Sequence, residues 1–204
     1  MFLILYFQNQ VIMSKPLINS EDYKLFIGRP INQDCTFFEN KIYDFLDNLG
    51  IEYKTLKHPE AFTMEECQKV RDNINAPVAK NLFLTNKQQT KFYLLLMPAN
   101  KAFKTKYLSS QINSARLSFA TPEHMMQFLG VSPGSVTPLG LIKDTELSVN
   151  LLIDSDLKKE NTFACHAGIN SASVMMSFSD FINIVIPSTR HEIKYVSLPW
   201  EPIS

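Results

Sequence analysis

Lys80, the loop from Gly134 to Gly140, and His166 are the parts of this chain whose residue types could support catalysis. Lys80 begins a strand-like segment, immediately before residues expected to be buried. The glycines of the loop permit positive φ and Pro138 restricts it, so its backbone could point carbonyls at an ammonium group and N–H groups at an oxyanion. His166 precedes a turn between two expected strands, where it could hydrogen-bond a substrate. Each feature also has an ordinary structural reading: a lysine that reaches solvent, a connecting loop, a strand-end histidine.

Familiar catalytic and metal-binding patterns are absent from the sequence. There is no G-x-S-x-G elbow, P-loop or G-x-G-x-x-G, and no His-x-x-x-His or Cys-x-x-Cys pair. Cys165 and His166 are adjacent, so on a strand they face opposite sides, and we expect Cys165 in the core rather than as a nucleophile. These patterns point to none of the familiar catalytic centres, and we expect no metal and no cofactor.

Basic residues are concentrated in one part of the chain. Twenty Lys and Arg balance twenty Asp and Glu overall, but the segment from Asn73 to Pro122 contains no acidic residue. Such segregation predicts a phosphate-binding face, whereas a solvated surface with acidic neighbours is the alternative. The seven basic residues of this segment are Lys80, Lys87, Lys91, Lys101, Lys104, Lys106 and Arg116.

Helical and strand patterns interleave along the chain. Apolar spacing with Gly50 as a stop predicts one helix, Thr63-Met64-Glu65-Glu66 has capping-box spacing for a second, and Thr121-Pro122 begins another that ends at Gly130. Ser179 is expected to cap a final helix. Several connections are too short for parallel crossovers, so we expect a mixed α/β fold: a mixed β-sheet flanked by helices. The expected helices span 40–49, 64–72, 101–109, 122–130 and 179–186, and the expected strands 51–56, 82–84, 92–97, 116–119, 147–153, 161–165, 171–176 and 193–197.

Length and composition fit a single globular domain with an N-terminal extension. The chain has 204 residues, of which 45% are hydrophobic and 20% charged. We expect residues 1–38 to form the extension and 39–204 the domain, and Met13 to be the true start, with 1–12 upstream. The apolar run at 1–6 is too short to span a bilayer, and three cysteines without a framework spacing indicate a reducing compartment. We therefore expect a soluble cytoplasmic protein.

The order of several short motifs resembles the YbaK/ProX-type prolyl-tRNA editing proteins. These are freestanding relatives of the editing domain inserted in bacterial prolyl-tRNA synthetases. The resemblance spans roughly 39–198. The motifs are His58-Pro59, Phe62-Thr63, Lys80-Asn81-Leu82, Met97-Pro98-Ala99, Arg116-Leu117-Ser118-Phe119-Ala120, Gly134-Ser135-Val136-Thr137-Pro138 and Cys165-His166 with Asn170.

This resemblance implies hydrolysis of mischarged aminoacyl-tRNA in trans, on a partly barrel-like mixed sheet. The subgroup it most resembles clears alanine from the tRNA for proline, so that tRNA and, transiently, prolyl-tRNA synthetase are the implied partners. By resemblance, Lys80, Gly134 and His166 are catalytic. Residues implied in substrate binding are Asn81, Ser135, Val136, Thr137, Pro138, Asn170, His58 and Thr63. Residues expected to bind tRNA are Lys87, Lys91, Lys101, Lys104, Lys106 and Arg116.

One departure from the family pattern keeps alternatives open. The family commonly has proline after the pocket histidine, whereas this chain has Ala167. The alternatives are a tRNA-binding or regulatory module of the same fold, a deacylase for cysteinyl or seryl esters, and a hydrolase of small amino-acid esters. The basic segment argues against the last.

Overall fold

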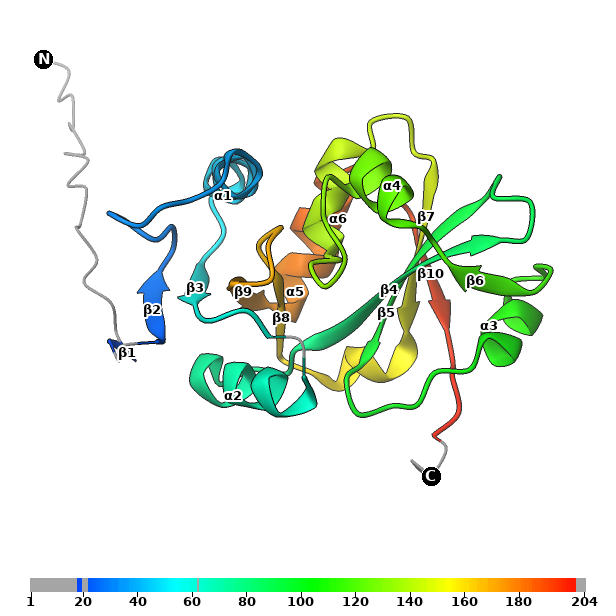
Figure 1. Cartoon of the computed structure of the whole chain (residues 1–204), viewed down its shortest axis with the longest axis horizontal. Helices are drawn as coiled ribbons and strands as arrows, with labels where there is room; N and C mark the ends of the chain where they lie inside the picture. Colours follow the sequence, from blue (N-terminus) through cyan, green and yellow to red (C-terminus); the bar gives the residue numbers. More distant parts are fainter. Residues whose placement is uncertain (1–17, 20–21, 62, 201–204) are drawn as a thin grey trace, which may run out of the picture.

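A computed structural model describes residues 18–19, 22–61 and 63–200 of the chain (Figure 1). The strands are β1 (Ile18–Asn19), β2 (Lys24–Ile27), β3 (Tyr53–Lys57), β4 (Ala79–Asn86), β5 (Phe92–Pro98), β6 (Leu117–Phe119), β7 (Val149–Asp154), β8 (Thr162–His166), β9 (Ala172–Ser177) and β10 (Ile193–Val196). The α-helices are α1 (Phe37–Leu49), α2 (Met64–Ile74), α3 (Thr105–Gln111), α4 (Pro122–His124), α5 (Phe178–Asp180) and α6 (Ile186–Ser188). Two π-helical stretches, η1 (Met125–Leu129) and η4 (Phe181–Val185), and two 3₁₀ helices, η2 (Pro138–Lys143) and η3 (Ser155–Lys159), complete the elements.

The strands form two five-stranded sheets, so the mixed α/β class is confirmed, with the expected sheet divided in two. The first sheet, in the order β1-β2-β3-β9-β8, is antiparallel throughout. The second, in the order β10-β7-β5-β4-β6, is mixed: β10, β7 and β5 are parallel, while β4 is antiparallel to both neighbours. A single parallel bridge between Val78 and Ala164 connects them at the start of β4.

Both long helices begin and end where local chemistry dictates. Thr36 and Glu39 form a capping box that starts α1 three residues earlier than the apolar spacing predicts, and Gly50 ends it at φ 65°. The predicted box at Thr63 and Glu66 starts α2, which ends at left-handed Asn75. The expected β4–β5 hairpin is also confirmed, pairing Ala79 through Thr85 with Pro98 through Phe92.

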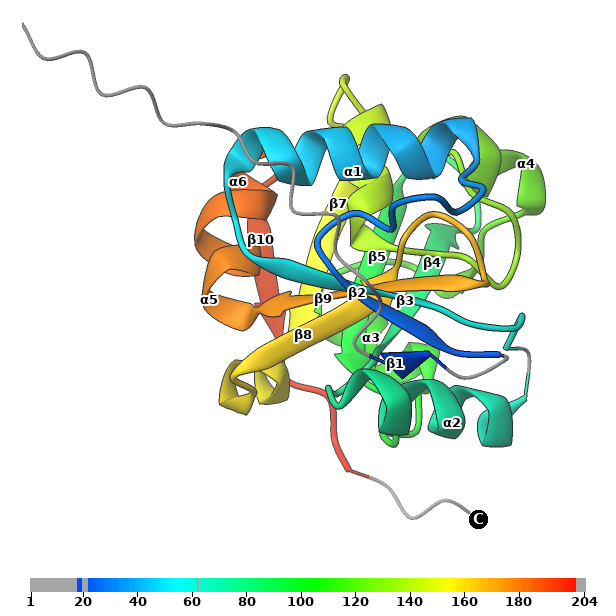
Figure 2. The same ribbon diagram turned by 90° about the vertical axis from the view of Figure 1, so that its left-hand side faces the viewer.

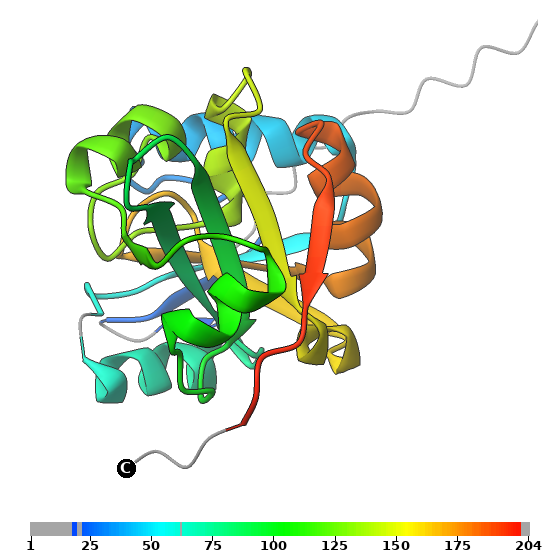
Figure 3. The same ribbon diagram turned by 90° about the vertical axis from the view of Figure 1, so that its right-hand side faces the viewer.

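Three apolar clusters hold these layers together. The largest contains residues of α1, η2 and η4 together with residues of both sheets. A second lies between the outer face of the mixed sheet and α3, seen in green in front of that sheet in Figure 3. The third lies between α2 and the antiparallel sheet, and Figure 2 shows α1 and α2 on opposite sides of these strands.

Two further sequence expectations change in the structure. Ser177, not Ser179, caps the last helical segment by accepting the N–H of Asp180, because β9 runs directly into that segment. Lys24–Ile27, expected in the N-terminal extension, forms β2 and pairs with β3, while residues 1–17, including the expected upstream start, lie outside the described residues. No helix within the described residues is long and apolar enough to cross a membrane.

Candidate functional site

A cavity of about 270 Å³ lies at the start of β4, close to the bridge that connects the two sheets. Its apolar wall comes from α2, β4 and the loops around them, and its polar groups come from β4, α2, β8 and β9. The apolar residues are Ala61, Val70, Val78, Ala79, Ala99 and Val136, and the remaining ones are Cys67, Arg71, Lys80, Asn81, Gly134, His166 and Ser173. The structure therefore brings together all three residues that the resemblance implies are catalytic.

Lys80 lies at the second position of β4, paired with Met97 of β5. Its ammonium donates a hydrogen bond to the carbonyl oxygen of Lys101 at 3.0 Å. Partial burial lowers the pKa of Lys80 below its usual value. Lys80 lines both the cavity and an open groove on the outer side of the mixed sheet, so this residue lies where the two meet.

Asn81 and the loop containing Gly134 form another part of the cavity wall. The Asn81 side-chain amide donates to the carbonyl of Val136 at 3.2 Å, while its Oδ1 is buried without a hydrogen-bond partner. Gly134 adopts φ 85°, a region that other residues rarely occupy, and faces the cavity. The unpartnered Oδ1 is an acceptor suited to an ammonium group.

The rest of the loop is held in place by hydrogen bonds to its own backbone and to β8. The Thr137 hydroxyl donates to the carbonyl of His166 at 2.6 Å, and the same oxygen accepts from the N–H of Leu139. Pro138 occupies the first turn of η2, and the N–H of Ser135 is bonded to Ser132. Ser135, Thr137 and Pro138 are buried and do not line the cavity. They hold the cavity wall in position, and the substrate contact that the resemblance implies for them stays a prediction.

His166 presents a neutral imidazole to the cavity. Burial, reinforced by neighbouring His58, lowers its pKa to about 4, and its Nδ1 is buried without a hydrogen-bond partner. Cys165 points the other way into the main core, where burial raises its pKa, as expected for alternating strand residues. His166 lines the cavity although Ala167 replaces the proline of the family pattern, and the N–H of Ala167 donates to the carbonyl of Ala172 across the turn.

The depressed pKa of His166 predicts how stability depends on pH. His166 binds a proton at about pH 6.5 in the unfolded chain and only near pH 4 in the folded one. The stability that its neutral form contributes is therefore fully present above pH 6.5 and is lost as the pH falls toward 4. This single group accounts for a loss on the order of 3 kcal/mol. Histidine NMR titration of the folded protein should give a midpoint near 4 for His166. The same titration in urea should return it to about 6.5, and a folded midpoint above 6 would contradict the burial.

Three other residues expected to bind substrate are not among those that line the cavity. Both ring nitrogens of His58 are engaged, Nε2 with the Ser173 hydroxyl at 3.0 Å and Nδ1 with the carbonyl of Pro59 at 2.7 Å. Thr63 caps α2, and its hydroxyl accepts the N–H of Glu66. Asn170 lies in the turn after His166, with its side-chain nitrogen and oxygen both buried and without partners.

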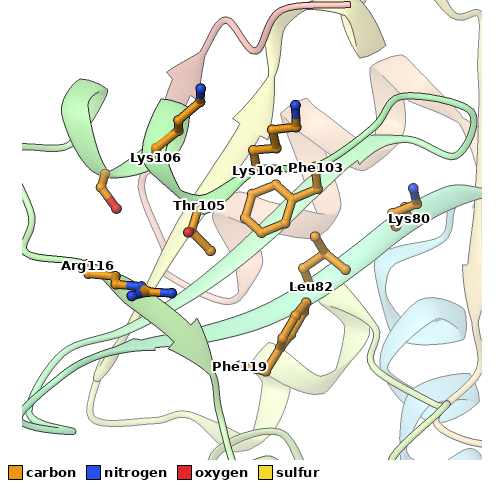
Figure 4. Close-up of a pocket in the computed structure, with 9 residues that line it drawn as sticks. Lys80, Leu82, Phe103, Lys104, Thr105, Lys106, Arg116 and Phe119 are labelled. Atoms are coloured by element: carbon orange, nitrogen blue, oxygen red, sulfur yellow. The ribbon is translucent and has the colours of Figure 1, made fainter. Parts of the chain in front are cut away.

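The basic segment divides into three places. Lys101 is 1% exposed, and its ammonium is held at 2.8 Å by both Asp154 and Asp156, so its predicted role in tRNA binding is wrong. Lys87 and Lys91 are exposed at the far end of the β4–β5 hairpin, about 20 Å along the strand from Lys80. The other basic residues, Lys104, Lys106 and Arg116, surround the open groove beside Lys80 (Figure 4).

Sequence reasoning missed the contribution of α2. Cys67, Val70 and Arg71 all line the cavity. They follow an i, i+3, i+4 spacing, which places them on one face of the helix. That spacing was the available signal, but it does not tell a cavity-facing helix from one that only covers a core.

The sequence and fold place this chain among known editing proteins. Residues 58–184 match the model of the aminoacyl-tRNA editing domain. The prolyl-tRNA editing protein ProX of Acetoanaerobium sticklandii is 32% identical over 141 residues, covering 69% of this chain and 85% of the relative. The prolyl-tRNA synthetase associated domain-containing protein 1 of Danio rerio is 31% identical over 153 residues, covering 74% and 82%.

A solved structure shares the architecture. A crystal structure of a candidate trans-editing enzyme for prolyl tRNA synthetase superposes with a TM-score of 0.59 and 16% identity. The match covers 81% of this chain and all of that one. Together with the domain match and the identity to ProX, the arrangement of Lys80, Gly134 and His166 around one cavity has a plain explanation: this chain belongs to the aminoacyl-tRNA editing domain family.

Proposed function

We propose that this protein edits the tRNA for proline in trans, hydrolysing the ester of a mischarged amino acid, which is alanine. Members of the family are aminoacyl-tRNA deacylases, and the relatives described above are named for prolyl-tRNA editing or for association with prolyl-tRNA synthetase. The reaction releases the free amino acid and intact tRNA. Its macromolecular partner is the charged tRNA, and prolyl-tRNA synthetase is a transient one.

The position of Lys80 carries this proposal. It contributes to a small, largely apolar cavity on one side and to an open basic groove on the other. An aminoacyl-tRNA has the same two parts, a small acyl group and a polyanion, joined by an ester at the terminal ribose. A substrate bound across the junction would place its ester beside the Lys80 ammonium.

Hydrolysis here requires positioning and charge stabilisation rather than a protein nucleophile. The ester is already activated by its α-ammonium group and the neighbouring ribose hydroxyl. Asn81 Oδ1 is placed to accept from the ammonium, and the backbone at Gly134 lies at the same wall. Water attacks the ester carbonyl and the C–O bond to the ribose breaks. The ribose oxygen then takes a proton from the attacking water. The vicinal hydroxyl of the tRNA assists the water, and Lys80 stabilises negative charge nearby.

Alanine is favoured because the cavity is small and its wall is mainly aliphatic. A synthetase pocket built for proline cannot strongly reject a smaller side chain, since each lost methylene is worth only about 1–3 kcal/mol. A second site can exclude proline by size. His166 and Ser173 add polar groups to the lining that suit a hydroxyl or thiol, so serine and cysteine are the competing substrates.

A panel of esters tests the choice of substrate. The tRNA for proline is charged with alanine, serine, cysteine or proline, and first-order deacylation is followed with purified protein. We expect alanine to be released at least about tenfold faster than proline, the ratio expected from exclusion of one or two methylene groups. Faster release of serine or cysteine would reassign the substrate. Binding of tRNA without hydrolysis of any ester would favour the binding-module alternative.

A further inference from the structure

An aromatic wall accompanies the basic residues in the open groove next to Lys80. The groove has a volume of about 930 Å³ and contains Phe103 and Phe119, with Leu82 between the two rings in Figure 4. Phe119 is 60% exposed although it is a large apolar residue on a short edge strand. Exposed aromatic side chains within a basic groove are the composition that single-stranded nucleic-acid sites use.

We propose that this groove binds the unpaired 3′-terminal nucleotides of the tRNA, with bases stacked on Phe103 and Phe119. The inference rests on the proposed function and deepens it, because it assigns the part of the tRNA adjacent to the ester. The groove and the acyl cavity share Lys80. Nucleotides directly 5′ of the esterified ribose therefore enter the groove when the acyl group occupies the cavity.

The geometry of the two rings favours unpaired bases. Their centroids are 6.4 Å apart and their planes differ by 65°. One flat base therefore cannot stack face-to-face on both. Each ring instead offers its face to a different base or its edge to the same one. Bases inside a duplex are stacked on their neighbours and do not offer a free face, so the wall selects a single strand.

Charge around the rings suits a phosphate backbone. Lys104, Lys106 and Arg116 are exposed at the groove, and the segment from Asn73 to Pro122 supplies no acidic side chain. Lys104 and Lys106 belong to the start of α3, and Arg116 immediately precedes β6, so the cations reach the groove from two separate segments. A strand with its bases on the rings would keep its phosphates near these cations.

The test measures binding of uncharged RNA, so it needs no hydrolysis. A fluorescently labelled acceptor-stem hairpin with an unpaired 3′ end is compared with the same hairpin ending bluntly, by anisotropy at fixed salt. Phe103→Leu and Phe119→Leu remove the π faces and keep apolar bulk. The control is Phe37→Leu, since Phe37 is 77% exposed on α1 and does not line the groove.

We expect the unmodified protein to bind the overhang hairpin more tightly than the blunt one. Each groove variant should weaken overhang binding about 5- to 100-fold and leave blunt binding unchanged, while Phe37→Leu should behave like the unmodified protein. Equal affinity for the two hairpins, or full affinity of a protein that carries both Phe103→Leu and Phe119→Leu, would overturn the inference.

Deacylation by the same proteins separates this inference from the proposed function. If the variants bind the overhang hairpin normally and still deacylate, base stacking on Phe103 and Phe119 is contradicted and the proposed function is not. If the unmodified protein binds the overhang hairpin specifically but hydrolyses no ester, the binding inference is supported and the proposed reaction is contradicted. Circular-dichroism melts of all variants identify any loss that comes from unfolding.

Discussion

Replacing Lys80 with alanine should slow deacylation of the preferred ester by about 100- to 1,000-fold, the usual cost of removing one preorganised group that stabilises transition-state charge. The lysine is half-buried at the junction of cavity and groove, and its ammonium is already oriented by the carbonyl of Lys101. The ammonium therefore needs little reorientation when the substrate binds. Single-turnover rates with saturating enzyme measure the effect on the chemical step.

Lys91→Ala is the matched control for Lys80→Ala. Lys91 carries the same charge and immediately precedes β5, the strand paired with β4, but it lies at the far end of the hairpin. Its single-turnover rate should stay within about twofold of the unmodified protein, as expected for an exposed residue remote from the site. If the two substitutions reduce the rate equally, Lys80 acts only through overall charge, and its place in the site is wrong.

Replacing Lys101 with methionine should lower the free energy of unfolding by about 3–5 kcal/mol, the cost of breaking a buried ion pair from one side. The Lys101 ammonium is fully buried and bonded to Asp154, whose side chain is only 1% exposed. Without Lys101, that carboxylate keeps a hydrogen bond to the N–H of Asp156 but loses its cation. Urea unfolding at pH 7 measures the loss.

Two further variants identify the origin of the loss. Lys159 also pairs with Asp156, but its side chain is 77% exposed, so Lys159→Met should cost less than about 1 kcal/mol. Adding Asp154→Asn to Lys101→Met should recover part of the stability, because the stranded charge is removed. A Lys101→Met protein as stable as Lys159→Met would contradict a buried network.

Local features were predictable where one short segment determines the outcome. The capping box at Thr63 and Glu66 specifies the start of α2 through side-chain-to-backbone hydrogen bonds within one turn. The β4–β5 hairpin likewise depends on two apolar runs and the polar loop between them. The division into two sheets depends instead on long-range pairing, such as β5 with β7, which sequence patterns do not encode.

Candidate site residues could be named but not sorted by role. Lys80 and Lys101 are both lysines in one basic segment, yet one reaches a cavity and the other is neutralised by carboxylates more than fifty residues later. The same limit applies to His166 and His58. Only the fold shows that Ser173 and Pro59 occupy both nitrogens of His58, while Nδ1 of His166 has no partner.

The only tryptophan of the chain provides a built-in optical reporter for the Lys101 network. The indole N–H of Trp200 donates to Asp156 at 2.7 Å, and the Lys101 ammonium lies 5.0 Å from its ring centroid. Its emission therefore senses the carboxylates and cation behind Lys80, without a label. Fluorescence and circular dichroism should change together if the C-terminal segment unfolds with the domain. An earlier fluorescence change would reveal a local opening of the segment around Trp200, next to the Lys101 network.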